Sequence, residues 1–92
     1  MTELCEEVAI INKRGLHARA SAKFVNTVAL LPDGVEVRVT KDGSDAAGGS
    51  ILGLMMLGAA KGDSIEICVS GHGADNALQQ LVGLVRGGFG ED

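Results

Sequence analysis

Alternation of apolar and polar residues predicts four short strands. It is clearest over residues 35–40, where valines alternate with polar side chains, and it recurs over residues 5–11 and 65–69. Asp42 and Gly43 form a tight-hairpin signal, so a short strand at residues 44–47 is expected to run antiparallel to the second strand. The apolar positions of each longer strand share one face, which is typical of a sheet with one buried face.

Apolar residues three or four positions apart predict two longer helices and one short helix. Residues 18–31 and 74–86 each form one apolar stripe, and each run ends at glycine or proline signals. Ser50 is an N-cap candidate for a short helix that extends through Leu57. That helix is apolar on nearly all sides, so some of its residues must face solvent or a partner. Residues 89–92 are too polar and too short to form another element.

These segments follow one another as β-α-β-β-α-β-α, which indicates an α+β fold in one domain spanning residues 1–92. We expect an open-faced β-sandwich, in which a four-stranded antiparallel sheet of order 1-4-2-3 is covered on one face by three helices. The apolar faces of the strands then point toward the helices. Cys5, Glu66 and Cys68 are expected on the open face.

The composition excludes several classes of protein. The chain of 92 residues has a net charge of −4 and contains no Trp or Tyr, whereas nucleic-acid-binding domains usually carry a basic surplus and aromatic stacking residues. No signal-peptide pattern or long apolar run is present, so a cytoplasmic protein without membrane partners is expected. We also expect a monomer without nucleic-acid partners. Cys5 and Cys68 lack metal-ligand spacing, and we expect two reduced strand cysteines, no metal site and no cofactor.

Basic residues gather in one part of this acidic chain. Lys13, Arg14, Arg19 and Lys23 are four of its eight basic residues, and no Asp or Glu lies between residues 10 and 31. They predict a local basic patch that steers the protein toward an acidic partner surface. A solvated helix face without a partner is the alternative.

His17 follows a glycine-bearing loop at the predicted start of the first long helix. Free backbone N–H groups and aligned peptide dipoles favour an anion at a helix N-terminus. One nitrogen of a neutral imidazole can act as a nucleophile while a hydrogen bond holds the other, and Arg19 can offer its guanidinium to phosphoryl oxygens. The pattern makes His17 and Arg19 candidates for phosphoryl transfer, although a histidine that only caps or packs gives the same pattern.

Residues 15–19 (Gly-Leu-His-Ala-Arg) and 50–58 (Ser-Ile-Leu-Gly-Leu-Met-Met-Leu-Gly) together resemble the HPr family, histidine-containing phosphocarrier proteins of the bacterial phosphotransferase system. The resemblance spans nearly the whole chain. It implies the fold described above and a phosphoryl carrier, not an enzyme, that receives a phosphoryl group on Nδ1 of His17 from enzyme I and passes it to an enzyme IIA domain. Ala20 stands where many members carry proline. The absence of that proline is expected to loosen the helix start without removing a reacting group.

The resemblance also implies a regulatory site and a docking surface. In some members a dedicated HPr serine kinase/phosphorylase phosphorylates the serine at the place of Ser50, and the added charge weakens docking to enzyme I. A regulatory binding module controlled by Ser50 is therefore the alternative function, and a plain helix cap is the simpler role of this serine. Partners are expected to dock over His17 and nearby basic and apolar residues; the candidates are Arg14, Lys23, Leu52 and Met55.

His72 is the rival histidine. It lies in a Gly-His-Gly loop without an arginine two residues on, and no cysteine or carboxylate pattern completes a metal site around it. We therefore assign it no function. Sugar transport and the nitrogen-related branch of the system both use HPr-like carriers, and residues 54–57 and 88–92 look somewhat more like the nitrogen-branch carrier.

Overall fold

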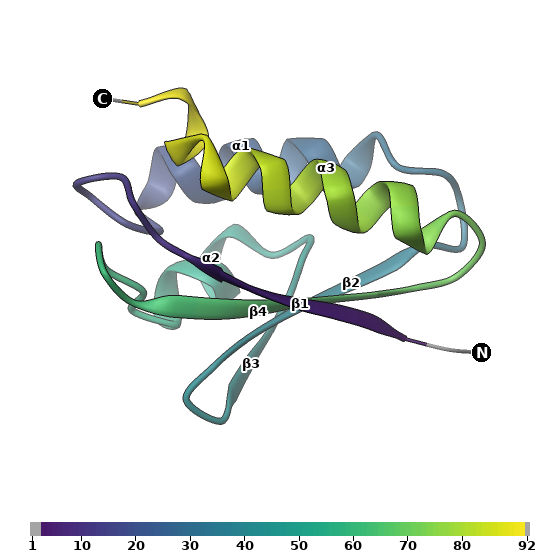
Figure 1. The fold of residues 1–92 in the computed structure, drawn as a ribbon, viewed down its shortest axis with the longest axis horizontal. Coiled ribbons are helices and arrows are strands. Elements are labelled where there is room, and N and C mark those ends of the chain that lie inside the picture. The colour runs from purple at the N-terminus through teal and green to yellow at the C-terminus, as the bar shows by residue number, and fades with distance from the viewer. Residues whose placement is uncertain (1–2, 92) are drawn as a thin grey trace.

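The structure, a computed structural model, describes residues 3–91 and confirms the predicted α+β architecture (Figure 1). Its strands are β1 (Leu4–Ala9), β2 (Glu36–Lys41), β3 (Ser44–Ala47) and β4 (Ser64–Ser70). Its helices are α1 (Ala18–Ala29), α2 (Ile51–Met56) and α3 (Ala74–Arg86), followed by the short 3-10 helix η1 (Gly88–Gly90). Within the described residues, no helix is both long enough and apolar enough to cross a membrane.

The four strands form one antiparallel sheet in the predicted order, β1-β4-β2-β3. β4 pairs with β1 on one side and with β2 on the other, so β1 and β3 are the two edge strands. Successive side chains of a strand point to opposite faces. Ile65, Ile67 and Val69 of β4 are accordingly buried against the helices, while Glu66 lies exposed on the open face.

The helices form a second layer over one face of the sheet. Figure 1 shows α1 and α3 side by side above the strands, and α2 packs against α1 and β3. The core between the layers is aliphatic except for Phe24 and Phe89, which are 0% and 1% exposed. Burial of such large apolar side chains is the main contribution to stability, at about 1.5–3 kcal/mol each.

The prediction that residues 89–92 form no element was wrong for the part that the structure describes. Gly88–Gly90 form a short 3-10 helix, and the Phe89 ring enters the core although its φ of 57° is left-handed. Burying an aromatic ring of this size offsets the roughly 1–3 kcal/mol that such a backbone conformation costs. Asp92 lies outside the described residues.

The expectation of two reduced cysteines was also wrong, because Cys5 and Cys68 form a disulfide. The two residues are directly opposite each other in the β1–β4 pair, and their Cα atoms are 4.0 Å apart. Opposite residues on one face of an antiparallel pair bring their side chains together without any backbone movement. The register of β1 with β4, which the spacing of the two cysteines in the sequence does not indicate, places the sulfur atoms within bonding reach.

Candidate functional site

His17 is the N-cap residue of α1, as its position in the sequence predicts. Its Nδ1 atom accepts a hydrogen bond from the backbone N–H of Arg19 at 3.3 Å, and its carbonyl oxygen accepts one from Ser21 at 2.9 Å. The imidazole therefore takes the place that serine or aspartate usually occupies at a helix start. It lies beside the free N–H groups and the positive end of the helix dipole, where an anion is favoured.

Gly15 sets the path of the chain into this helix. Its φ is +61°, and a Cβ atom at this position would collide with the backbone of Ala59. The close approach lets Leu16 donate its N–H to the carbonyl oxygen of Ala59 at 3.0 Å. Ser21, which is fully buried, donates its hydroxyl to the carbonyl oxygen of Leu16 at 3.2 Å. The loop is thereby fixed both to α1 and to the segment that precedes β4.

Glu91, which the sequence analysis did not single out, contacts the ring of His17. Nε2 of His17 and Oε2 of Glu91 are 2.8 Å apart, and the two side chains are 21% and 18% exposed. The buried amide of Asn12 donates to Oε1 of Glu91 at 3.1 Å and to the carbonyl oxygen of Gly15 at 2.9 Å. An ionised carboxylate only accepts hydrogen bonds. The network therefore assigns the ring proton to Nε2 and leaves a lone pair on Nδ1.

Two contacts hold the C-terminal segment against α1. The ring of Phe89 is buried in the core, and Nζ of Lys23 donates to the carbonyl oxygen of Phe89 at 2.6 Å. A signal for the first contact exists in the sequence, since Phe89 is one of only two aromatic residues and follows a pair of glycines. No sequence pattern indicates that Glu91 meets a side chain 74 residues away.

The carboxyl group of Glu91 is ionised at neutral pH. Burial raises its pKa, but hydrogen bonds from Asn12 and His17, together with the charges of His17 and Lys23, outweigh burial. The pKa of Glu91 consequently lies below its ordinary value of 4.5. A carboxylate in this state can hold the Nε2–H group of a neutral ring and pair with the ring when it becomes cationic.

His17 and Glu91 lie at the edge of an open hollow of about 590 Å³. The structure brings the predicted basic residues together here; the lining consists of Lys13, Arg14, His17, Arg19, Lys23, Gly90 and Glu91. Arg19 forms no ion pair with any residue from 3 to 91. Four cationic groups against one carboxylate give the hollow a positive charge, and it can receive an anionic group beside the lone pair of Nδ1.

The short helix α2 lies next to α1 and carries the other candidate residues. Oγ of Ser50 accepts a hydrogen bond from the N–H of Gly53 at 2.9 Å, so Ser50 is the N-cap of α2. Leu52 and Met55 are 67% and 41% exposed, whereas Leu54 is fully buried. One side of α2 therefore belongs to the core, and the other presents apolar side chains to solvent.

His72 is exposed in the loop between β4 and α3 and does not line the hollow. Figure 1 shows this loop at the opposite end of the molecule from the start of α1. Within residues 3–91, His17 is the histidine that basic side chains surround and that a carboxylate holds.

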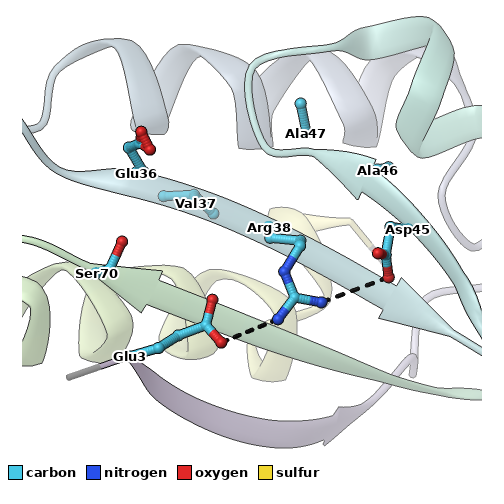
Figure 2. A pocket seen from close by; sticks show the side chains of 8 residues that line it. All are labelled: Glu3, Glu36, Val37, Arg38, Asp45, Ala46, Ala47 and Ser70. Carbon is cyan, nitrogen blue, oxygen red and sulfur yellow. Dashed lines mark hydrogen bonds and ion pairs between the residues drawn. The ribbon is translucent and has the colours of Figure 1, made fainter. Parts of the chain in front are cut away.

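The open face of the sheet carries a separate group of polar side chains around Arg38 (Figure 2). Its guanidinium donates to Glu3 at 3.0 Å and to Thr40 at 2.9 Å, and it pairs with Asp45 at 3.4 Å. The hydrogen bond to Glu3 is the largest of the effects that raise the pKa of Arg38 above its ordinary value. A shallow hollow of about 350 Å³ lies beside this group and borders β2, β3 and β4.

Glu3, Cys5 and Cys68 place three atoms of metal-ligand type within 4.8 Å of one another on this face. Cysteine binds metals as a thiolate. Both sulfur atoms are bonded to each other here, so the group in its disulfide form offers no thiolate to a metal ion.

Comparison with known proteins decides the family. Residues 4–86 match the family model described as PTS HPr component phosphorylation site. The chain belongs to the HPr family. The resemblance found in residues 15–19 and 50–58 is thereby confirmed along nearly the whole chain.

Individual HPr-family proteins agree with this assignment. A phosphocarrier protein HPr of Neisseria meningitidis is 49% identical over 88 residues, which cover 96% of this chain and 97% of that protein. A phosphocarrier protein NPr of Shewanella violacea is 38% identical and is covered over 98% of its length. The crystal structure of HPr-C-His from Thermoanaerobacter tengcongensis superposes with a TM-score of 0.87 at 35% identity, over 100% of this chain and 99% of that one. The HPr fold and the phosphocarrier class follow for this chain.

Proposed function

We propose that this HPr-family chain is a phosphoryl carrier of the phosphoenolpyruvate-dependent phosphotransferase system, with Nδ1 of His17 as the acceptor. Enzyme I supplies the phosphoryl group, and an enzyme IIA domain receives it. The proposal rests mainly on one contact: Nε2 of His17 lies 2.8 Å from Oε2 of Glu91. Both residues line the basic hollow. That contact leaves the lone pair of Nδ1, which faces the N–H of Arg19, as the nucleophile at the point where an anion is favoured.

In the proposed step the lone pair of Nδ1 forms a bond to phosphorus while the donor's bond to phosphorus breaks and its electron pair stays with the donor. Before transfer, the backbone N–H of Arg19 donates to Nδ1. Once Nδ1 is bonded to phosphorus, this N–H can donate to a phosphoryl oxygen instead, and the guanidinium of Arg19 supplies a second, charged donor. Phosphorylation on Nδ1 makes the ring cationic. Glu91 stabilises that cation through a charge-assisted hydrogen bond from Nε2–H.

The chain by itself catalyses nothing in this proposal. His17 is a covalent intermediate, and the partners provide the in-line geometry that phosphoryl transfer requires. We place their docking surface over the hollow and the exposed side of α2. Leu52 and Met55 serve as apolar anchors, while Arg14 and Lys23 steer an acidic partner. A single carrier domain of residues 1–92, monomeric and cytoplasmic, is sufficient for this role.

Regulation through Ser50 is the second candidate function. Phosphate on the N-cap of α2 would meet free backbone N–H groups and would add charge next to the exposed apolar side of that helix. An HPr serine kinase/phosphorylase would be the partner that adds it. The basic hollow at His17 has no role in a purely regulatory module, and it therefore favours the carrier.

Labelling with enzyme I and radioactive phosphoenolpyruvate tests the proposal. Wild-type protein and the His72→Ala variant should incorporate an acid-labile label, and His17→Ala should incorporate none. A chain with His17→Ala that is folded by circular dichroism and still takes up label at the wild-type rate would refute the assignment.

A further inference from the structure

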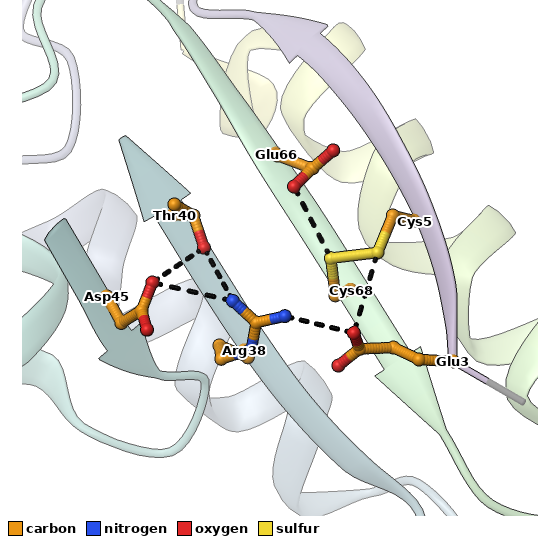
Figure 3. Close-up of polar contacts among 7 residues, drawn as sticks. All are labelled: Glu3, Cys5, Arg38, Thr40, Asp45, Glu66 and Cys68. Atoms are coloured by element: carbon orange, nitrogen blue, oxygen red, sulfur yellow. Dashed lines mark hydrogen bonds and ion pairs between the residues drawn. A yellow bond between two sulfur atoms is a disulfide. The ribbon is translucent and has the colours of Figure 1, made fainter. Parts of the chain in front are cut away.

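The disulfide between Cys5 and Cys68 is the feature of the open face that the carrier function does not use. It joins the edge strand β1 to its neighbour in the sheet, β4, on the face away from the helices (Figure 3). Cys5 is exposed, whereas Cys68 is 1% exposed. The two sulfur atoms therefore differ in their access to solvent.

We propose that this disulfide is a thiol–disulfide exchange site that takes small external thiols of the glutathione class, with Cys5 as the sulfur that is attacked. The external thiolate forms a bond to Sγ of Cys5 as the Cys5–Cys68 bond breaks, and the electron pair leaves with Sγ of Cys68, which takes a proton from water. A second thiol attacks the mixed disulfide and releases Cys5. In sum, two thiols are oxidised to one disulfide, and the protein gains two electrons and two protons.

The sheet order decides which sulfur is open to attack. A thiolate approaches along the line of the S–S bond, from behind the sulfur that it attacks. Behind Cys5 lies the outer edge of β1, which has no further strand among residues 3–91. Behind Cys68 lies β2, where Arg38 is the residue directly opposite. Figure 3 shows the guanidinium of Arg38 on that side, between Asp45 and Glu3.

Arg38 reduces the repulsion that the acidic side chains around the disulfide exert on an anionic thiolate. Arg38 neutralises Glu3, whose Oε1 atom lies 3.9 Å from Sγ of Cys5 and would otherwise repel an anionic thiolate. Arg38 is also the cation nearest in register to Cys68, where negative charge develops as the bond breaks. Glu66, whose Oε1 atom is 3.6 Å from Sγ of Cys68, opposes that development.

Opening the bond changes how firmly the start of the chain is held. Val8 is the only residue of β1 with a buried side chain. Besides backbone pairing with β4 and packing against α3, the described residues hold residues 3–7 through two surface ion pairs, Arg38–Glu3 and Arg86–Glu6. Exposed ion pairs contribute little to stability. Reduction should therefore loosen residues 4–7 and leave the chain beyond Val8, including His17, in place.

The proposal can be tested by incubating native, oxidised protein with millimolar glutathione. The reaction is quenched with an alkylating agent in denaturant, so that the buried Cys68 is also alkylated, and the modified cysteines are mapped by mass spectrometry. We expect a mixed disulfide on Cys5 and alkylation on Cys68, followed by full reduction. On reduction, hydrogen exchange at residues 4–7 should rise at least tenfold while that of α3 stays unchanged. An adduct on Cys68, or a disulfide that reacts only after unfolding in urea, would overturn the proposal, as would unchanged exchange in β1.

Matched variants isolate the two causes. With glutathione disulfide as oxidant, Cys68→Ser should form an adduct on Cys5, and Cys5→Ser should form one on Cys68 at least tenfold more slowly, because that sulfur is buried. Arg38→Gln should slow the reduction of the native disulfide several-fold, whereas Arg86→Gln, which removes the other ion pair of β1, should not. Equal rates in the two cysteine variants would contradict the proposed role of solvent access to sulfur. Equal rates in the two arginine variants would contradict the proposed role of the Arg38 charge.

Discussion

The hollow around His17 and the open face of the sheet carry opposite charges. Four basic residues and one carboxylate line the hollow. The open face presents Arg38 among acidic side chains, namely Glu3, Glu7, Glu36, Asp45 and Glu66. The net charge of −4 describes neither region. An acidic partner is attracted to the hollow and repelled by the open face, so charge alone orients it toward His17.

The two regions also differ in how their side chains are held. At the hollow, the decisive contact joins His17 to a residue 74 positions later, whereas on the open face cross-strand neighbours hold one another. The hollow therefore depends on packing of the C-terminal segment, and the open face depends on strand register. Changes in one region are expected to leave the other unaffected.

Removal of the disulfide should have a large effect on stability and none on phosphoryl acceptance. In the loop-entropy account, a cross-link across 63 residues stabilises the fold by about 4 kcal/mol. The double variant Cys5→Ser/Cys68→Ser should lose up to about 4 kcal/mol in urea unfolding. The folded variant should still label His17 at the wild-type rate. A tenfold slower labelling rate would show that the two regions are coupled.

Gly15→Ala should damage the hollow through the backbone. The added Cβ combines a left-handed conformation, which costs about 1–2 kcal/mol, with a collision against Ala59 that costs about 1–3 kcal/mol more. Gly34→Ala is the matched control, because Gly34 also has a positive φ but open space around it. Gly34→Ala should lose about 1–2 kcal/mol of unfolding free energy, and its His17 should be labelled at the wild-type rate. Equal losses of unfolding free energy would argue against the close approach at Gly15.

Arg19→Ala and Arg38→Ala compare one arginine from each region. Loss of a charged donor to the phosphoryl group costs about 1.5–3 kcal/mol, so Arg19→Ala should slow transfer roughly tenfold to a hundredfold. Its thermal midpoint should barely change, because Arg19 is exposed and has no ion pair within residues 3–91. Arg38→Ala should transfer at the wild-type rate. Stopped-flow labelling with enzyme I measures the transfer rate of both variants. Similar slowing in Arg19→Ala and Arg38→Ala would contradict the view that the hollow and the open face act independently.

Leu52→Asp should weaken binding of enzyme I without unfolding the domain. A buried apolar anchor contributes about 1.5–3 kcal/mol, which corresponds to a loss of roughly tenfold or more in affinity. Leu30→Asp is the control, since Leu30 is 88% exposed at the other end of α1. Titration by calorimetry measures both. If Leu52→Asp unfolds the chain, or if Leu30→Asp weakens binding equally, the docking surface is misplaced.

Glu91→Gln should have the smallest effect, a severalfold slower transfer at neutral pH, because a neutral amide stabilises the cationic phosphohistidine less well. The folded-state pKa of Glu91 is lowered, so its stabilising contribution is present above pH 4.5 and disappears as the pH falls through the folded value. The stability difference between wild type and variant should thus vanish in acid. Urea unfolding at neutral and acidic pH checks this, and a difference that persists in acid would exclude the carboxylate as its source.

The fold was predictable because its patterns are local. The hairpin signal fixed β3 at Ser44–Ala47, and the apolar stripe fixed α3 at Ala74–Arg86, residue for residue. The predicted end of β1 was two residues too late, at Ile11 instead of Ala9, because alternation continues through Ile10, whose N–H instead donates to the carbonyl oxygen of Asp63 outside the strand. Local alternation reports which face is buried, and it does not report where strand pairing stops.

The site was predictable only in part. His17 at a helix start and the basic residues near it are features of one continuous stretch, so the sequence contains them. Glu91 depends on the left-handed turn at Phe89, and the disulfide depends on the register of β1 with β4. Both are contacts between distant segments that form only once the layers have packed, and no local pattern encodes their partners.

The nitrogen that carries phosphorus is the most direct test of the carrier account. Protein with isotope-labelled histidine, phosphorylated by enzyme I and phosphoenolpyruvate, can be examined by nitrogen and phosphorus NMR. The account predicts coupling of phosphorus to Nδ1 of His17, with Nε2 protonated before and after transfer because Glu91 holds it. Coupling to Nε2, or a phosphoryl group on His72, would contradict it.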